Sequence, residues 1–131
     1  MKLTEPEWQI MNALWDKHPA KVRDVVERLP SAVNWAYTTV KTMLDRLVEK
    51  KAVGKSKRGN IGLYEPLVSR RQARRTAMRL MLDQAFDGAF GPMMHFLVED
   101  EKLSAEQRKV LIKILSGKSK KRESENDYTN K

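Results

Sequence analysis

Cysteine is absent from this chain of 131 residues. The absence excludes disulfide bonds, a thiol nucleophile and every zinc site that requires a cysteine ligand. Chains without cysteine are common in reducing compartments, where disulfides do not persist. We therefore expect this protein to be cytoplasmic.

Histidine is nearly absent as well, and the two that occur, His18 and His95, do not have the spacing of metal ligands. His18 precedes Pro19, a context in which histidine is more often a helix-end residue than a catalyst. The sequence also has no G-x-S-x-G nucleophile motif, no Walker loop and no paired-carboxylate signature. We predict that the protein is not an enzyme and has no catalytic residues, no metal site and no cofactor.

Long hydrophobic runs are missing too. Nowhere do about 18 apolar residues follow one another, so we expect no membrane insertion. The first residues, Met1-Lys2-Leu3, lead directly into charged residues, unlike the apolar stretch of a signal peptide.

Acidic residues are outnumbered: 17 Asp and Glu stand against 26 Lys and Arg, which gives a net charge of +9 and a pI of about 9.9. Such a balance points to an anionic partner, with nucleic acid first and an acidic membrane surface second. A merely solvated basic surface is the alternative, because net charge describes association and not fold.

Three successive segments show the spacing of amphipathic helices. The first opens at Thr4, which forms a predicted capping box with Glu7, and ends before Pro19. The second covers residues 22–29, and the third follows a turn, with Asn34 as its expected cap. The apolar face of the third helix contains Ala36, Tyr37, Val40, Met43, Leu44, Leu47 and Val48.

A β-hairpin is predicted after the third helix, over residues 53–64. Gly59 and Asn60 would supply the positive φ angles of a tight turn. Gly54 and Gly62 weaken the strand prediction, so we expect a loose hairpin. Three helices followed by a hairpin is the order of a winged helix-turn-helix, in which the third helix is the recognition helix and the hairpin is the wing.

The second half is predicted to be helical. A helix begins with a capping box of Ser69 and Gln72 and runs to about Phe86, an apolar segment covers residues 93–98, and a last helix follows Ser104. The apolar seams of the two helices are Ala73, Ala77, Leu80, Met81 and Phe86 in the first, and Val110, Leu111, Ile114 and Leu115 in the last.

This second half is too small to bury its own apolar side chains well, so two copies should pack as a symmetric pair. The predicted dimer contacts are Leu80, Met81, Phe86, Phe96, Leu97, Leu111 and Ile114. We therefore predict a mainly α protein with an N-terminal winged helix-turn-helix domain in residues 1–68, a helical dimerisation domain in residues 69–117 and a disordered basic and polar tail in residues 118–131.

Basic residues concentrate from the third helix onward. Residues 41–71 contain nine Lys and Arg and three Asp and Glu, so this stretch carries +6 of the net charge of +9. The N-terminal part of a recognition helix enters the major groove, where a Thr methyl can pack on a thymine methyl and Lys or Arg can reach guanine or phosphate. The predicted DNA contacts are Thr38, Thr39, Lys41, Thr42 and Arg46 on the helix and Arg58 and Asn60 on the wing.

Each of these residues also has a plainer interpretation. Threonines near the start of a helix are often caps, and a basic hairpin is often only solvated. Any one residue is more often a backbone contact than a base contact. Three binding functions remain open at this point: a specific DNA-binding regulator, a protein-interaction winged helix and a non-specific nucleic-acid binder.

Five segments of the sequence carry a resemblance to a known family. They are LTEPEWQIMNALWD at 3–16, VRDVVERL at 22–29, WAYTTVKTMLDRLVEKKAV at 35–53, LYEPLVSRRQA at 63–73 and FLVEDEKLS at 96–104. Over residues 3–115 the sequence resembles the bacterial penicillinase and copper repressors that include BlaI, MecI and CopY. The resemblance implies a transcriptional repressor that acts as a homodimer, with N-terminal winged helices on a palindromic double-stranded DNA operator and intertwined C-terminal helices.

Two departures from the family pattern bear on how the repressor would be released from DNA. The copper repressors sense metal through a C-terminal cysteine motif, which this chain lacks. The penicillinase repressors are cleaved at an Asn-Phe bond when a membrane sensor-protease is triggered, whereas the matching segment here is His95-Phe96-Leu97. Cleavage on either side of Phe96 is therefore a hypothesis, and release by a small-molecule ligand in the dimer cleft is the alternative.

Overall fold

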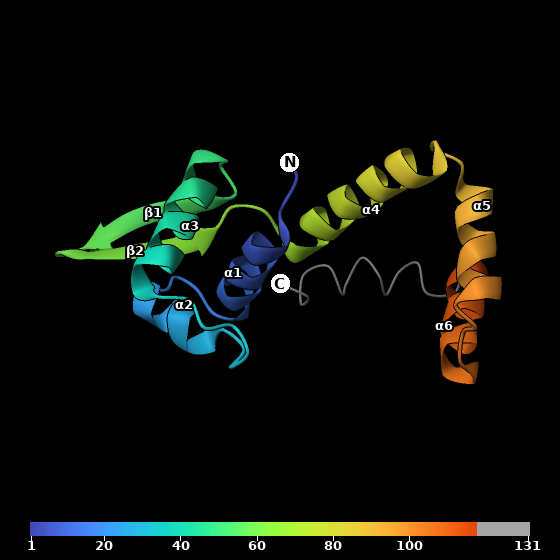
Figure 1. The fold of residues 1–131 in the computed structure, drawn as a ribbon, viewed down its shortest axis with the longest axis horizontal. Coiled ribbons are helices and arrows are strands. Elements are labelled where there is room, and N and C mark those ends of the chain that lie inside the picture. Colours follow the sequence, from blue (N-terminus) through green and yellow to red (C-terminus); the bar gives the residue numbers. More distant parts are fainter. Residues whose placement is uncertain (118–131) are drawn as a thin grey trace. The chain divides into compact units, whose positions relative to one another are not determined.

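The structure, a computed structural model, describes residues 1–117, and the predicted tail at 118–131 lies outside the described residues. Contacts divide the chain between Arg74 and Arg75 into an N-terminal unit and a C-terminal unit. The mainly α fold class is confirmed, with three helices followed by a hairpin (Figure 1). The elements are α1 Glu5–Asp16, α2 Val22–Arg28, α3 Tyr37–Glu49, β1 Val53–Arg58, β2 Ile61–Pro66, α4 Arg70–Phe86, α5 Phe90–His95, the π-helical turn η1 Phe96–Asp100 and α6 Ala105–Leu115.

The start of α1 confirms the predicted capping box. The Glu7 amide donates to Thr4 Oγ1 at 3.3 Å, and the Thr4 amide donates to Glu7 Oε1 at 2.8 Å. Two N–H groups that a helix start would leave without partners are satisfied in this way. His18 follows the helix, with Nδ1 3.0 Å from the Leu14 carbonyl oxygen, in the helix-end position that the sequence indicated.

The core of the N-terminal unit is built from α1, α2, α3 and both strands. Each buried Leu, Ile or Val contributes roughly 1.5–3 kcal/mol relative to an exposed one. In α3 the predicted apolar face is confirmed at Val40, Leu44 and Leu47. The opposite side of α3 is thereby turned toward solvent. The largest fully buried side chains are Ile10, Met11, Leu14, Val25, Val40, Leu44, Leu47, Val53 and Tyr64.

The start of α3 differs from the prediction. The helix begins at Tyr37 with Ala36 as its N-cap and without a side-chain cap, so the prediction of Asn34 as the cap is wrong. Trp35 packs against the core from the segment before the helix, which keeps the chain non-helical past Asn34. Tyr37, expected near the buried face, is 48% exposed and lies at a surface hollow beside Lys41.

β1 and β2 form an antiparallel hairpin with a two-residue turn, since Arg58 lies opposite Ile61. Gly59 adopts a φ of +64°. Asn60 is not among the described residues with positive φ, so that part of the prediction is wrong. A two-residue turn that begins with glycine needs positive φ only at this first position.

The two strand glycines do not loosen the hairpin, contrary to the prediction. Gly54 pairs with Glu65 and Gly62 pairs with Lys57 in a continuous ladder. A Cβ atom at Gly54 would come within 3.2 Å of Leu67 Cδ2. The glycine therefore makes room for the leucine that follows β2.

Two contacts that the sequence did not indicate tie the hairpin to the helices. Ala20, between α1 and α2, exchanges two backbone hydrogen bonds with Tyr64 of β2, at 2.9 and 2.8 Å. Trp15 of α1 donates from Nε1 to the Val68 carbonyl at 2.9 Å, and the Arg70 guanidinium lies 5.3 Å from the centre of the Trp15 ring. The base of the wing is thus fixed to the helical core.

The C-terminal unit leaves most of its apolar side chains exposed. Leu82, absent from the predicted seam, is the one buried side chain among residues 75–117. Ala73, predicted for that seam, packs instead against the N-terminal core. Within one chain five residues of the predicted seams are exposed: Ala77, Met81, Val110, Ile114 and Leu115. So few helical segments cannot cover one another on all sides.

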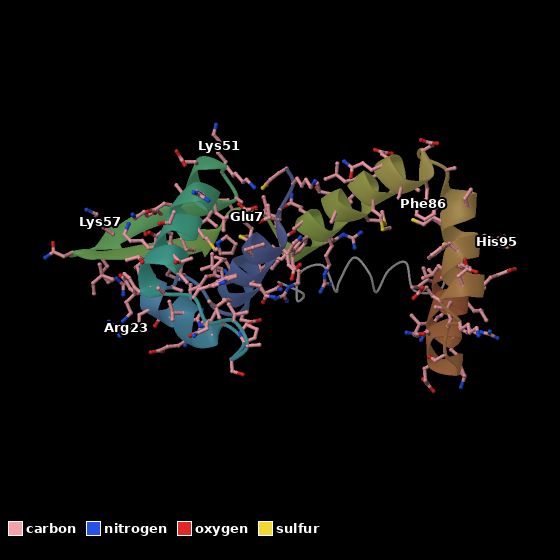
Figure 2. All side chains as sticks on the ribbon, viewed as in Figure 1. Glu7, Arg23, Lys51, Lys57, Phe86 and His95 are labelled. Atoms are coloured by element: carbon pink, nitrogen blue, oxygen red, sulfur yellow. The ribbon has the colours of Figure 1, made fainter. Side chains whose placement is uncertain are left out.

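The predicted apolar segment at residues 93–98 is helical. α5 continues directly into η1, and the Phe96 ring meets the Phe86 ring edge-on with centroids 6.3 Å apart. Asp87 and Gly88, both with positive φ, end α4 before this segment. Figure 2 shows Phe86 at the end of α4 and His95 on α5.

An ion pair joins α1 to the residue after α3. Lys50 Nζ donates to Glu7 Oε1 at 2.6 Å and to the Lys2 carbonyl at 3.0 Å. Figure 2 labels Glu7 on α1. Its exposed fraction is only 8%. Burial by itself raises the pKa of Glu7, but the hydrogen bonds from Lys50 and Thr4 outweigh it, so this pKa lies below the usual value for glutamate.

Because the pKa of Glu7 is lower in the folded chain than in the unfolded chain, the ionised carboxylate stabilises the fold above the unfolded pKa. That contribution is lost as the pH falls through the folded pKa. We expect Glu7→Gln to lower the free energy of unfolding at pH 7 by about 1–3 kcal/mol while keeping the cap acceptor. We also expect it to flatten the loss of stability on acidification below about pH 5.

Urea unfolding of both proteins from neutral to acidic pH checks this. Glu5→Gln, at an exposed glutamate in the same helical turn, is the matched control. An acid dependence as steep in Glu7→Gln as in the wild type would contradict the prediction.

Candidate nucleic-acid interface

The predicted DNA contacts on α3 all lie on one side of the helix. Val40, Leu44 and Leu47 are fully buried, so the other side faces solvent. We refer to that exposed side as the recognition face. It presents Thr38, Thr39, Lys41, Thr42 and Arg46, each of which is exposed.

Thr42 uses its hydroxyl hydrogen within the helix. Its Oγ1 donates to the Thr38 carbonyl at 2.9 Å, the bond to the preceding turn that threonine forms in helices. The methyl group and the hydroxyl lone pairs remain available. Thr42 is therefore suited to pack on a thymine methyl or to accept a hydrogen bond from a base.

The predicted wing residues lie at the end of the hairpin. Arg58 is the last residue of β1 and Asn60 is the second residue of the turn, and both are exposed. Within residues 1–117 neither side chain has a hydrogen-bond or ion-pair partner. Both side chains are free to contact a ligand.

Asp45, on α3, connects the recognition face to the wing. Its Oδ2 accepts from Lys41 Nζ at 2.9 Å, while its Oδ1 accepts from the Tyr64 hydroxyl at 2.9 Å and from Lys55 Nζ at 3.4 Å. Lys55 also lies over the Tyr64 ring, with Nζ 5.3 Å from its centre. One carboxylate therefore joins α3, β1 and β2.

This network shifts the pKa values of its members. Burial by itself raises the pKa of Asp45, but the hydrogen bonds from Lys41 and Tyr64 and the charge of Lys55 bring it below the usual value. The hydrogen bond to Asp45 raises the pKa of Lys41. Both groups are therefore charged at neutral pH.

A hollow of about 470 Å³ opens between the start of α2, the start of α3 and the wing. Its cations are Lys21, Arg23, Lys41, Lys55 and Lys57, and within the described part of the chain no carboxylate lines it. Figure 2 shows Arg23 on α2 and Lys57 on β1, both at the surface of the N-terminal unit. The remaining lining residues are Val22, Tyr37, Asn60, Ile61, Gly62 and Tyr64.

Sequence reasoning missed several residues of this surface. Lys21 and Arg23 were not singled out, although the helix before a recognition helix usually crosses the DNA backbone, a signal that could have found them. Asp45 and Lys55 were not singled out either. The spacing of Lys41 and Asp45 is visible in the sequence, but nothing there brings Lys55 and Tyr64 to the same carboxylate.

The arrangement suits an extended polyanion. Clustered cations neutralise phosphates, and the short threonines allow close approach of α3 to base edges. Residues 1–117 contain no group of three or more His, Asp or Glu side chains that could hold a metal ion. None of the helices in this range is long and apolar enough to cross a membrane.

The predicted dimer contacts lie in the C-terminal unit, where the single chain covers them only in part. Met81, Phe96, Leu97 and Ile114 are exposed. The other three, Leu80, Phe86 and Leu111, are half-buried.

The predicted cleavage segment spans the junction of α5 and η1. Phe96 is 50% exposed, and the side chain of His95 is also exposed, with Nε2 3.6 Å from Glu99 Oε1. The peptide bonds on both sides of Phe96 lie in helical backbone. Both bonds would have to leave the helix before a protease could bind them as extended chain.

A sequence profile of the penicillinase repressor family matches residues 3–117. The methicillin resistance regulatory protein MecI of Staphylococcus aureus (strain N315) is 26% identical over 117 residues, which cover 89% of this chain and 95% of that protein. The penicillinase repressor of Bacillus licheniformis is 25% identical over 123 residues, which cover 93% of this chain and 96% of that protein. A solved CopR repressor structure is 30% identical, with a TM-score of 0.45 over 53% of this chain and 100% of that one.

Proposed function

This chain is a DNA-binding transcriptional repressor of the penicillinase repressor family, and we propose that it acts as a homodimer on a palindromic operator. Members of the family are repressors and not enzymes. The observation that carries the proposal is the cationic hollow between α2, α3 and the wing, which Lys41 of the recognition face helps to line.

In the proposed complex α3 lies in the major groove. Thr38, Thr39 and Thr42 are short, so the helix can approach the base edges closely. Lys41 and Arg46 are long enough to reach guanine acceptors or phosphates. The full burial of the opposite face supports this orientation, because α3 can present no other side to DNA.

The wing and α2 would hold the DNA backbone on either side of the groove. Arg58 and Asn60 at the hairpin end suit a phosphate or the adjacent minor groove. Lys21, Arg23 and Lys57 line the hollow beside α3 and suit further phosphates. These contacts would add affinity and salt dependence without reading sequence.

Exposed apolar side chains support the homodimer. Of the fourteen large hydrophobic side chains that are exposed within residues 1–117, ten belong to the C-terminal unit, which buries only Leu82. Single soluble domains rarely leave so much apolar surface uncovered. A second copy of the same unit would cover it symmetrically, and a two-fold dimer would then require an operator with two inverted half-sites.

Release of the repressor would follow from loss of the dimer. We hypothesise cleavage beside Phe96, at the junction of α5 and η1, through a membrane sensor-protease pathway. Both Phe96 and Leu97 lie among the exposed apolar side chains, so a cut there would divide the proposed dimer contacts. Mass spectrometry of the protein from induced cells should show fragments ending at His95 or Phe96, whereas an intact chain in induced cells would reject the hypothesis.

Selection of bound duplexes from a random DNA pool at physiological salt tests the proposed function. We expect an enriched inverted repeat. Lys41→Ala and Thr42→Ala should then each reduce the difference in binding free energy between the operator and non-specific DNA by about 1–3 kcal/mol, because each removes a proposed base contact.

Arg58→Ala should instead weaken binding to all sequences alike, because a phosphate contact carries no sequence information. Lys51→Gln, at an exposed cation of the same unit outside the hollow, is the matched control (Figure 2). No enriched sequence, with binding that disappears as salt rises, would overturn the proposal and leave only an electrostatic surface.

The homodimer is tested at its exposed apolar side chains. Ile114→Asn should weaken self-association at least about tenfold, because it places a polar amide in an apolar contact. Analytical ultracentrifugation over a range of protein concentrations measures this. Lys113→Asn, at the neighbouring exposed position of α6, should leave the dimer intact, and equal effects of the two changes would argue against the proposed contact.

A further inference from the structure

Asp45 has no role in the proposed function, although its carboxylate lies between the recognition face and the wing. Repulsion between a carboxylate and DNA phosphates lowers affinity, so an acid at this place needs an explanation. Asp45 accepts hydrogen bonds from Lys41, Lys55 and Tyr64. The inference below rests on the proposed function.

Stability of α3 does not account for Asp45. Within a helix, a basic residue four positions before an acidic one is the less favourable order. Exposed ion pairs of this kind contribute about 0–1 kcal/mol. Both partners are substantially exposed, with 46% of the Lys41 side chain and 41% of the Asp45 side chain accessible. The pair therefore adds little to the helix.

Tyr64 makes Asp45 a fixed group. Tyr64 is 1% exposed, and its backbone is held by two hydrogen bonds to Ala20. Its hydroxyl donates to Asp45 Oδ1 at 2.9 Å, which anchors the carboxylate to the buried core. The carboxylate then holds Lys41 on α3 at 2.9 Å and Lys55 on β1 at 3.4 Å.

Restraint matters for a lysine because its long stem has many rotamers. A mobile ammonium can follow any phosphate, whereas a held ammonium reaches only the position that its anchor allows. A group held in its binding position also loses less entropy on binding.

We propose that Asp45 is a positioning residue for DNA recognition, which holds Lys41 and the wing in register and suppresses loose binding to DNA of any sequence. Its removal frees two lysines and deletes a negative charge at the interface. Binding to non-specific DNA then becomes tighter, and the preference for the operator decreases.

The test compares the wild type with Asp45→Asn on the selected operator and on a scrambled duplex of the same length and composition. We expect the ratio of the two affinities to fall about tenfold or more, chiefly through a rise in affinity for the scrambled duplex. Glu49→Gln is the matched control: it deletes the same charge one turn along α3, at an exposed residue without a side-chain partner within residues 1–117. It should change the ratio little.

Two further variants separate positioning from charge. Tyr64→Phe removes the anchoring hydroxyl without changing the charge or the buried ring, and it should lower the ratio in the same direction. In a Lys41→Ala background, Asp45→Asn should have a smaller effect on the ratio, because part of the effect passes through Lys41. Thermal unfolding of each variant establishes that it folds, and a misfolded variant would lose both affinities.

An operator preference as high in Asp45→Asn as in the wild type would overturn the inference while leaving the proposed function standing. Equal changes of the affinity ratio in Asp45→Asn and Glu49→Gln would overturn it too. Such a result would mean that Asp45 acts only through its negative charge and not by positioning Lys41. A wild type that binds both duplexes equally would overturn the proposed function and the inference with it.

Discussion

Burial of one face of α3 is the constraint on which the rest of the N-terminal unit depends. Val40, Leu44 and Leu47 are fully buried against the other helices and the hairpin, which fixes the rotation of α3 about its axis. At 100° per residue, this rotation decides which side chains face solvent. The burial of Val40, Leu44 and Leu47 on one side of α3 therefore leaves the recognition face exposed on the other side.

Tyr64 connects the buried core to Asp45 on the surface of α3. Its ring is buried, its backbone pairs with Ala20, and its hydroxyl reaches Asp45. Tyr64, a residue of β2, thus joins the hairpin to both the loop between α1 and α2 and to α3. In the proposed complex, the relative position of α3 and the wing decides whether both can contact one duplex.

The two units differ in how much of their apolar surface a single chain buries. The N-terminal unit buries most of its large apolar side chains within one chain, whereas residues 75–117 of the C-terminal unit leave ten exposed. The smaller unit has too few elements to enclose a core. In the proposed repressor this incompleteness is functional, because the surface that one chain leaves open would join two DNA-binding units and so make the recognition of a two-fold operator stronger than that of a single half-site.

The sequence by itself determined the order of helices and hairpin, the capping box of Thr4 and Glu7, and the exposed side of α3, because each follows from local spacing within one element. Only the tertiary structure decided where α3 begins, which residues of α2 join the surface, and that Tyr64 pairs with Ala20 and bonds to Asp45. These features join residues far apart in the chain. Periodicity fixes the direction of a side chain from its own helix or strand, but the distance between two elements depends on how the whole core packs.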